Sequence, residues 1–428
     1  NVLLLQESKG LELDEFDSHL KPFDISRVLA AALIDAFAHA KTFGSLIQIA
    51  EGLEKGLPSL ADGLGKAIQS GDVFAHLAAQ DLLPLVAQAT VLAMKFDAVV
   101  ANPPYMGSKY LTPFLKSFLK ANYKGFEKDL FSAFMIRNLT LTKESGQLGF
   151  MSPFVWMFIS SYEELRQHFI DNATLTSLVQ LEYGGFDGAV VPICTFTIAK
   201  QHAERYLGSF IKLSDFRGAE QQGPKTMEAI KDINCSWLYK ARPDEFKKIP
   251  GFPISYWVDQ KTVALFEKPK IGASFEVKEG LGTRDDAIFM RYFWEVDKTK
   301  IRLSAGGKQK WIKADKAGQF RRWFGNQIYI LNWENNGYAI KNHKNPDGSL
   351  KSRPQNTQYF FRDAVSWGKI GSGITSFRYR DATGGFTDAA PSIFGDGVKG
   401  ICGLLNSNVF KKFLEIQGGT LNVTLGII

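Results

Sequence analysis

The amino-terminal part of the chain has apolar residues at helical spacing. Between Asp24 and Ile49 they recur every three or four positions, and Asp24 or Ser26 can cap the first turn. The positions that carry the pattern are Ile25, Val28, Leu29, Ala32, Leu33, Ala36, Phe37 and Ala40. The pattern predicts a helix over residues 24–49.

The two segments that follow differ in composition. Residues 51–71 are rich in glycine and contain Pro58, so no helix is assigned to them. Residues 72–94 are apolar and rich in alanine, which predicts a second helical stretch that is broken near Pro84.

A short apolar run then changes the pattern. The run Phe96–Ala101 stops at the tetrapeptide Asn102-Pro103-Pro104-Tyr105. Continuous apolarity over so short a length predicts a buried strand of a parallel sheet, and the two prolines force the chain into a loop. The tetrapeptide is therefore expected at the carboxyl end of a strand, where open α/β sheets place their ligands.

Beyond this loop the pattern alternates between helices and strands. Helices are predicted at about 112–121, 129–142 and 162–172, and strands after Gly146, at 175–181 and at 192–199. The predicted fold class is α/β. Residues 1–205 are expected to form part of a doubly wound, Rossmann-like domain, 206–270 a connecting segment and 271–428 a mixed α+β region.

Charge is distributed unevenly between the two halves. Residues 1–200 hold 16 basic and 21 acidic side chains, whereas residues 201–428 hold 35 basic and 23 acidic ones. The densest part, 301–400, has 16 basic and 7 acidic residues with aromatic residues between them. Cations neutralise phosphates and flat rings stack on bases, so this composition is typical of a nucleic-acid surface. A solvated basic face over an aromatic core is the alternative.

Other classes of protein find little support. Cys194, Cys235 and Cys402 lie far apart, and neither they nor the histidines show metal-ligand spacing, so no disulfide framework and no metal site are predicted. The longest apolar stretch, 148–159, is interrupted by a Ser-Pro pair and is shorter than the roughly 20 residues that cross a bilayer. A cytoplasmic protein without a membrane span is expected.

The tetrapeptide Asn102-Pro103-Pro104-Tyr105 is the most specific feature of the chain, and it resembles the amino-methyltransferase signature, in which a strand ends in Asn/Asp/Ser-Pro-Pro-aromatic. The chemistry that this resemblance implies explains the residue types. An exocyclic amino group such as adenine N6 is a poor nucleophile, because its lone pair is delocalised into the ring. The Asn102 side-chain carbonyl and the Pro103 backbone carbonyl can each accept one N–H, which relocalises the lone pair and spreads the developing positive charge. Tyr105 would stack on a base flipped out of the duplex. The alternative is a surface turn that merely ends a strand.

More than the tetrapeptide matches a known family. The chain resembles the adenine-specific DNA methyltransferases of BREX phage-exclusion systems, the PglX type. The segments that carry the resemblance are Asn102–Lys109, Lys128–Phe134, Phe154–Ser161, Val277–Thr283, Trp367–Ile370, Ser376–Tyr379 and Leu404–Ser407. The resemblance implies that Asp129 and Phe134 help to line a cofactor pocket and that Phe186 gives a second aromatic contact to the flipped base. Asp129 as a helix N-cap and the two phenylalanines as core residues are the alternatives.

One element of the family's cofactor site is absent from the sequence. Such enzymes hold S-adenosylmethionine on a glycine-rich turn after the first strand, and none of the triplets Gly63-Leu-Gly65, Gly280-Leu-Gly282 and Gly371-Ser-Gly373 is expected at such a turn; each is assigned to a loop. The chain opens on Asn1 without a methionine, and Gly418–Val423 resembles the start of a target-recognition segment. We therefore expect a fragment that by itself binds the cofactor weakly or not at all.

These observations lead to one expected function and two alternatives. The parent protein is expected to transfer a methyl group from S-adenosylmethionine to adenine N6 in double-stranded DNA, with other phage-defence proteins as further partners. Arg321, Arg322, Arg378 and Arg380 are the predicted DNA-binding residues. A protein glutamine N5-methyltransferase uses the same tetrapeptide, but such enzymes are compact and lack a long basic, aromatic second half. A non-catalytic DNA-binding fragment is the second alternative.

Overall fold

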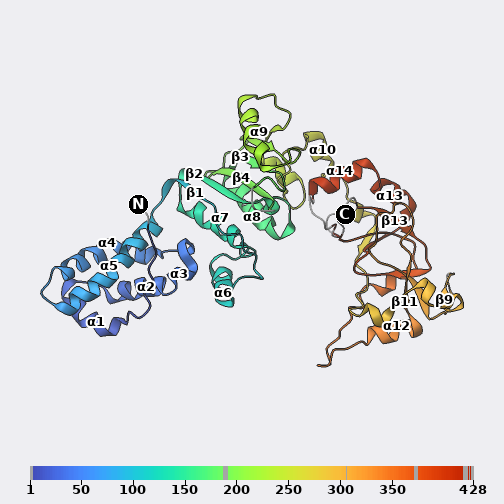
Figure 1. Cartoon of the computed structure of the whole chain (residues 1–428), viewed down its shortest axis with the longest axis horizontal. Coiled ribbons are helices and arrows are strands. Elements are labelled where there is room, and N and C mark those ends of the chain that lie inside the picture. Colours follow the sequence, from blue (N-terminus) through green and yellow to red (C-terminus); the bar gives the residue numbers. More distant parts are fainter. Residues whose placement is uncertain are drawn as a thin grey trace. The chain divides into compact units, whose positions relative to one another are not determined.

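The computed structural model describes residues 3–186, 191–304, 306–370, 375–417, 423 and 425. The chain divides into two compact units, Asn1–Lys247 and Lys248–Ile428, which are called unit 1 and unit 2 below. Figure 1 colours the chain along the sequence, and each unit is considered by itself. The triplet Gly371-Ser-Gly373 and most of Gly418–Val423 lie outside the described residues.

Unit 1 begins with a group of packed helices. They are α1 (Leu13–Leu20), α2 (Arg27–Phe37), α3 (Ala40–Phe43), α4 (Glu51–Ile68) and α5 (Val73–Ala93). Their apolar faces form one core, in which Leu33, Phe37 and Leu64 are fully buried. The blue helices in Figure 1 show α4 and α5 packed side by side. This helical group has its own core. The sequence analysis had assigned these helices to the α/β domain and did not predict a separate core.

Three of the helix predictions need correction. Helix α2 begins after its N-cap Ser26, as predicted, but it ends at Phe37 instead of running to residue 49. Residues 51–68 form a helix despite Pro58, and α5 continues through Pro84 without a break. Leucines at helical spacing bury one face of α4 and stabilise it through tertiary packing.

The triplet Gly63-Leu-Gly65 therefore lies in a helix, not in a loop. A Cβ at Gly63 would approach the Ile25 side chain and the Phe23 carbonyl to 2.7 and 2.8 Å. The glycine permits close packing of α4 against the preceding segment, so its role here is structural.

The rest of unit 1 is a mixed sheet with helices. Its strands are β1 (Phe96–Ala101), β2 (Thr142–Pro153), β3 (Thr174–Gln180), β4 (Ile193–Ala199), β5 (Gly208–Lys212) and β6 (Leu238–Ala241). Its helices are α6 (Pro113–Asn122), α7 (Leu130–Leu141), α8 (Glu163–Asn172) and α9 (Ala219–Lys231). The strand order is β1-β2-β4-β3-β5-β6. Strands β1, β2, β3 and β5 run parallel, and β4 and β6 run antiparallel to them.

This arrangement confirms an α/β fold and the predicted elements between residues 96 and 199, but it corrects two details. The sheet is mixed because β4 and β6 reverse direction. Strand β1 is an edge strand within the described residues, and Val100 is 83% exposed, so the expected burial of this strand is not found. Strands β5 and β6 belong to the same sheet as β1 to β4, and the boundary between the two compact units follows Lys247. The predicted boundaries near 205 and 270 stay predictions.

Unit 2 combines two further sheets with short helices. One sheet contains β8 (Met290–Tyr292), β9 (Ile301–Arg302), β10 (Trp311–Asp315), β11 (Tyr329–Asn332) and β14 (Gly384–Phe386). The other contains β7 (Glu276–Lys278), β12 (Ala364–Trp367), β13 (Phe377–Arg380) and β15 (Ser392–Phe394). The helices are α10 (Gln260–Leu265), α11 (Asp286–Phe289), α12 (Glu334–Lys341), α13 (Val398–Leu405) and α14 (Asn408–Gln417). Buried aromatic residues such as Trp367, Phe377, Phe386 and Phe394 fill its cores.

The described residues contain neither a membrane-spanning helix nor a metal-ligand cluster. No described helix combines the length and the apolarity that a membrane crossing needs. No group of three or more His, Cys, Asp or Glu side chains in the described part of the chain is arranged to hold a metal ion.

Candidate active site

Three loops of unit 1 leave the sheet at the same edge. Strands β1, β2 and β3 run parallel, so their carboxyl ends lie on one side of the sheet. The loop after β1 carries Asn102-Pro103-Pro104-Tyr105, the loop after β2 spans 154–162, and the loop after β3 leads to Phe186. The tetrapeptide thus occupies the predicted position, at the end of a strand whose neighbour in the sheet is parallel.

The two ends of the tetrapeptide are joined by a hydrogen bond. The Tyr105 hydroxyl donates to Asn102 Oδ1 at 2.8 Å. Burial raises the pKa of Tyr105, so the hydroxyl is neutral at pH 7 and able to donate. Among the described residues, no hydrogen bond to the Pro103 carbonyl is found. Within the described residues, the loop therefore presents the Pro103 carbonyl without a donor and the Asn102 carbonyl with one donor, the Tyr105 hydroxyl.

Asp129 fastens this loop to the start of α7. Its Oδ1 accepts from Met106 N–H at 3.0 Å and from Phe131 N–H at 3.2 Å, so one oxygen both caps the helix and holds the residue after Tyr105. The Leu130 N–H donates to the Met106 carbonyl at 3.0 Å, which adds a second tie. Burial raises the pKa of Asp129, and the hydrogen bonds from the backbone oppose this shift. The N-cap alternative is thus observed, and the cap also positions the tetrapeptide.

The neighbouring loop 154–162 is held by a buried arginine that sequence analysis missed. Arg166 on α8 is 1% exposed, and its Nη1 donates to the carbonyls of Trp156 and Ile159 at 2.7 and 2.8 Å. Burial lowers the pKa of Arg166 to about 10, which still leaves it charged at pH 7. An arginine in a helix with ordinary spacing carries no sequence signal for such a role.

Aromatic rings connect this loop with the tetrapeptide. Tyr162 lies 5.5 Å from Phe131, and Phe131 lies edge-on to Tyr105 at 6.5 Å between ring centroids. Burial raises the pKa of Tyr162, and the nearby charge of Asp129 acts in the same direction. The row of rings gives Tyr105 a fixed neighbour on one side and leaves it 36% exposed.

Phe186 is exposed, and its loop is fixed by a residue that the sequence did not indicate. Phe186 is 47% exposed, so it is not a core aromatic. The buried Gln222 on α9 accepts from Glu182 N–H at 3.1 Å and donates to the carbonyls of Phe216 and Gly218 at 2.6 and 3.0 Å. Gln222 therefore anchors the start of the loop that carries Phe186.

The described residues supply only part of a cofactor site. Phe134 packs with Leu46, Leu119 and Tyr123 in an apolar cluster, in agreement with its reading as a core residue. Asp129 has one oxygen engaged in the loop and the second, Oδ2, beside Gly107. No described segment provides the glycine-rich strand-to-helix turn that S-adenosylmethionine needs. The described residues therefore do not suffice to fit S-adenosylmethionine.

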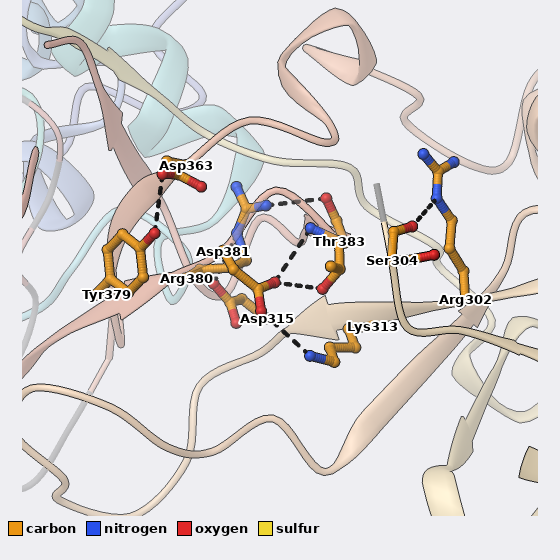
Figure 2. A network of polar contacts seen from close by, with 10 residues as sticks. Arg302, Ser304, Lys313, Asp315, Asp363, Tyr379, Arg380, Asp381 and Thr383 are labelled. Atoms are coloured by element: carbon orange, nitrogen blue, oxygen red, sulfur yellow. Dashed lines mark hydrogen bonds and ion pairs between the residues drawn. The ribbon is translucent and has the colours of Figure 1, made fainter. Parts of the chain in front are cut away.

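The predicted DNA-binding arginines of unit 2 fall into two groups. Arg321 and Arg322 lie in an exposed loop between β10 and β11, and neither has an acidic partner among the described residues. Arg378 and Arg380 lie in β13 and are only 3% and 1% exposed. Figure 2 shows Arg380 beside Asp315 of β10, with 3.1 Å between Nε and Oδ2.

The Arg380–Asp315 pair joins the two sheets of unit 2. Arg380 Nη1 also donates to the Gly384 carbonyl at 2.9 Å. Burial raises the pKa of Asp315 and lowers that of Arg380, while each charge favours the ionised form of the other. Because neither Arg378 nor Arg380 reaches the surface of the unit, their burial argues against the predicted phosphate contacts. Both side chains lie in the interior of unit 2 and stabilise it instead.

Comparison with known proteins agrees with this geometry. The family model described as Eco57I restriction-modification methylase matches residues 34–186, which include the tetrapeptide and Asp129. The adenine-specific methyltransferase BrxX of Escherichia coli O9:H4 (strain HS) is 32% identical over 91% of this chain and 32% of its own length. The adenine-specific methyltransferase PglX of Lacticaseibacillus casei (strain Zhang) is 29% identical over 98% of this chain and 36% of its own length. The predicted resemblance to PglX-type adenine-specific methyltransferases is confirmed.

These matches cover only part of each relative. The chain spans about a third of the length of these two relatives. Among solved structures, the Type IIL restriction-modification enzyme MmeI in complex with DNA covers 97% of this chain and 65% of its own chain, at 11% identity and a TM-score of 0.49.

Proposed function

We propose that the protein containing this chain is a DNA adenine N6-methyltransferase and that this chain supplies the side of the active site that holds the adenine. The carrying observation is the tetrapeptide Asn102-Pro103-Pro104-Tyr105 at the carboxyl end of β1, tied to α7 through Asp129. A loop fixed at its following residue can hold hydrogen-bond acceptors at constant positions, which is the condition for stabilising a developing charge.

The two acceptors act on the adenine amino group. Asn102 Oδ1 would accept one N–H of N6 and the Pro103 carbonyl the other, so that the nitrogen lone pair turns away from the ring towards the methyl donor. In the structure the Tyr105 hydroxyl fills the Asn102 acceptor at 2.8 Å. Entry of the base exchanges this hydrogen bond for one from N6, and the Tyr105 ring becomes free to stack on the base.

The base must leave the duplex to reach this loop. Stacking on Tyr105, with Phe186 as a second aromatic contact, offsets part of the unstacking energy. Both side chains are substantially exposed, as residues awaiting a base would be. Arg321 and Arg322 are proposed to hold the DNA backbone, because two unpaired exposed guanidinium groups match adjacent phosphates.

S-adenosylmethionine is the proposed methyl donor and supplies the electrophilic sulfonium methyl group. The residues of this chain bind and orient the amino group, and they exclude water from one side of it. Action within a BREX phage-defence system, with other proteins of that system as partners, follows from the resemblance to PglX-type enzymes. The glutamine-methyltransferase alternative gains no support, since both BrxX and PglX are named adenine-specific methyltransferases.

The proposal is tested by mapping N6-methyladenine in genomic DNA from cells that carry or lack the gene encoding this chain. We expect methylation at one sequence motif, present only with the intact gene and absent when Asn102→Ala is introduced. Methylation that is identical in the three strains would contradict the proposal. Equal protein levels in the intact and variant strains serve as the control.

A further inference from the structure

The loop Phe320–Phe324 of unit 2 combines charge, exposed rings and backbone strain. It reads Phe320-Arg321-Arg322-Trp323-Phe324, and all five residues are exposed. The aromatic members are 54%, 54% and 59% exposed in chain order. Isolated surface aromatic residues are common, but three within five positions form a concentrated apolar surface.

The backbone of this loop is fixed at its centre. Trp323 donates through its N–H to the Phe377 carbonyl at 3.0 Å and accepts from the Tyr379 N–H at 2.8 Å, so it pairs with β13 on both sides. The Arg321 N–H donates to the hydroxyl of the buried Ser376 at 3.2 Å. These contacts involve backbone groups of the loop and leave its side chains exposed, with the Arg322 guanidinium 5.5 Å from the centre of the Phe320 ring.

Trp323 also stands in a strained conformation. Its φ is +73°, and the Phe324 N–H donates to the Arg322 carbonyl at 2.9 Å, which makes Trp323 the centre of a γ-turn with positive φ. Such turns are rare and strained for a residue with a side chain, and strain of this kind persists where the surroundings impose it. The two hydrogen bonds to β13 are what impose it here.

We propose that Trp323 inserts between stacked base pairs of double-stranded DNA while Arg321 and Arg322 bind the flanking phosphates. This inference rests on the proposed function, in which the protein binds DNA. It adds how the loop 320–324 contacts that DNA. A wedge side chain must be held rigidly, because partial unstacking of a base step opposes its entry. The tied backbone of Trp323 provides that rigidity. Arg321 and Arg322, which directly precede Trp323 and have no acidic partner among the described residues, provide charge that is complementary to phosphates.

A mismatch makes the insertion measurable without knowledge of the recognition sequence. Two fluorescein-labelled 30-base-pair duplexes of one mixed sequence are compared, of which one carries a central T·T mismatch that weakens stacking. With residues 1–428 we expect about fivefold tighter binding to the mismatched duplex, since part of the unstacking is already done. Trp323→Ala should abolish this preference and weaken binding to the mismatched duplex about tenfold, with an unchanged salt dependence.

Three further variants separate insertion from misfolding and from charge. Trp323→Gly keeps the backbone, because glycine adopts φ +73° without strain, and should behave like Trp323→Ala. Trp294→Ala removes a tryptophan of the same unit that is 60% exposed, and should retain the preference. Arg321→Ala with Arg322→Ala should reduce the salt dependence for both duplexes and leave their ratio unchanged.

The outcomes are distinct. A wild-type preference that survives in Trp323→Ala and Trp323→Gly would overturn the insertion, because the mismatch would then be recognised elsewhere in the chain. Loss of the mismatch preference in Trp294→Ala would also overturn the insertion, because the effect would then not be specific to Trp323. If the wild-type chain binds neither duplex, the DNA contact in the proposed function fails, and the insertion fails with it.

Discussion

The acceptor loop 102–105 and the basic region 301–400 show how differently a motif and a composition predict function. The tetrapeptide is found where its sequence context placed it, at the end of β1, with Asp129 as the cap that holds it. In the basic region, the loop that carries Arg321 is exposed, whereas Arg380 is buried against Asp315. A motif fixes residues relative to a strand end, but a composition does not say which charges face the solvent.

The largest expected effect concerns the buried arginine. Arg380→Ala leaves Asp315 charged or protonated without its partner in the core, which should lower the free energy of unfolding by about 3–5 kcal/mol. Arg321→Ala should change it by less than about 0.5 kcal/mol. Urea unfolding followed by tryptophan fluorescence measures both. The distinction between the two arginines would collapse if Arg380→Ala were as stable as the wild type but bound DNA more weakly.

A matched double variant sharpens this test. Arg380→Met combined with Asp315→Leu replaces the ion pair with apolar side chains, and such replacements are often neutral or stabilising. We expect most of the lost stability to return. No recovery would indicate that the pair is needed for something other than mutual neutralisation.

The next effect concerns Asp129 and the acceptor loop. Asp129→Ala removes the acceptor shared by the Met106 and Phe131 N–H groups. It should lower helix stability by about 1 kcal/mol and turnover by about tenfold or more, because small displacements of reacting groups are costly. Asp129→Asn retains a carbonyl acceptor and should be mild. Equal damage from both, measured as kcat in the complete protein, would favour the cofactor role implied by the resemblance.

A smaller effect is expected at Tyr105. Tyr105→Phe keeps the ring and frees Asn102 Oδ1 from the hydroxyl, so KM for DNA should stay the same or fall slightly. Tyr105→Ala loses a stack worth about 1–3 kcal/mol and should raise KM. Steady-state methyl-transfer kinetics separate the two. Identical behaviour of the two variants would show that Tyr105 does not contact the base.

The smallest effect belongs to the exposed arginines. Each neutralised phosphate contact should reduce the slope of log affinity against log salt by about one unit, without dependence on DNA sequence. Arg321→Ala with Arg322→Ala should therefore weaken binding mostly at low salt. Titrations of DNA with residues 1–428 at several salt concentrations give this slope. An unchanged slope in the double variant would support the alternative, in which these arginines form a solvated surface that does not contact DNA.

Local patterns predicted most of the α/β part of unit 1. The alternation after residue 96 identified the helices and strands up to Ala199, and an aspartate ahead of an apolar helix signalled the N-cap at position 129. Helix α4 was missed because its glycines and Pro58 outweighed the helical spacing of its leucines. Tertiary packing overrides such local preferences, and the close contact at Gly63 is the example.

The residues that hold the site in place were beyond sequence reasoning. Gln222 and Arg166 act through backbone carbonyls of distant segments, and this leaves no spacing or motif to detect. The burial of Arg378 and Arg380 depends on Asp315, which lies more than sixty positions earlier in another sheet. Long-range pairing of this kind appears only once the sheets are assembled.

The central claim is that Asn102 Oδ1 accepts a hydrogen bond from the N6 amino group of the target adenine. Its most direct test is single-turnover methyl transfer by the complete protein with Asn102→Ala, alongside DNA binding by the same variant and Asn122→Ala as an exposed control. The account predicts that turnover falls by about 100-fold or more while DNA affinity and the control remain unchanged, because the lost acceptor acts mainly in the transition state. Methyl transfer at the wild-type rate by Asn102→Ala would contradict it.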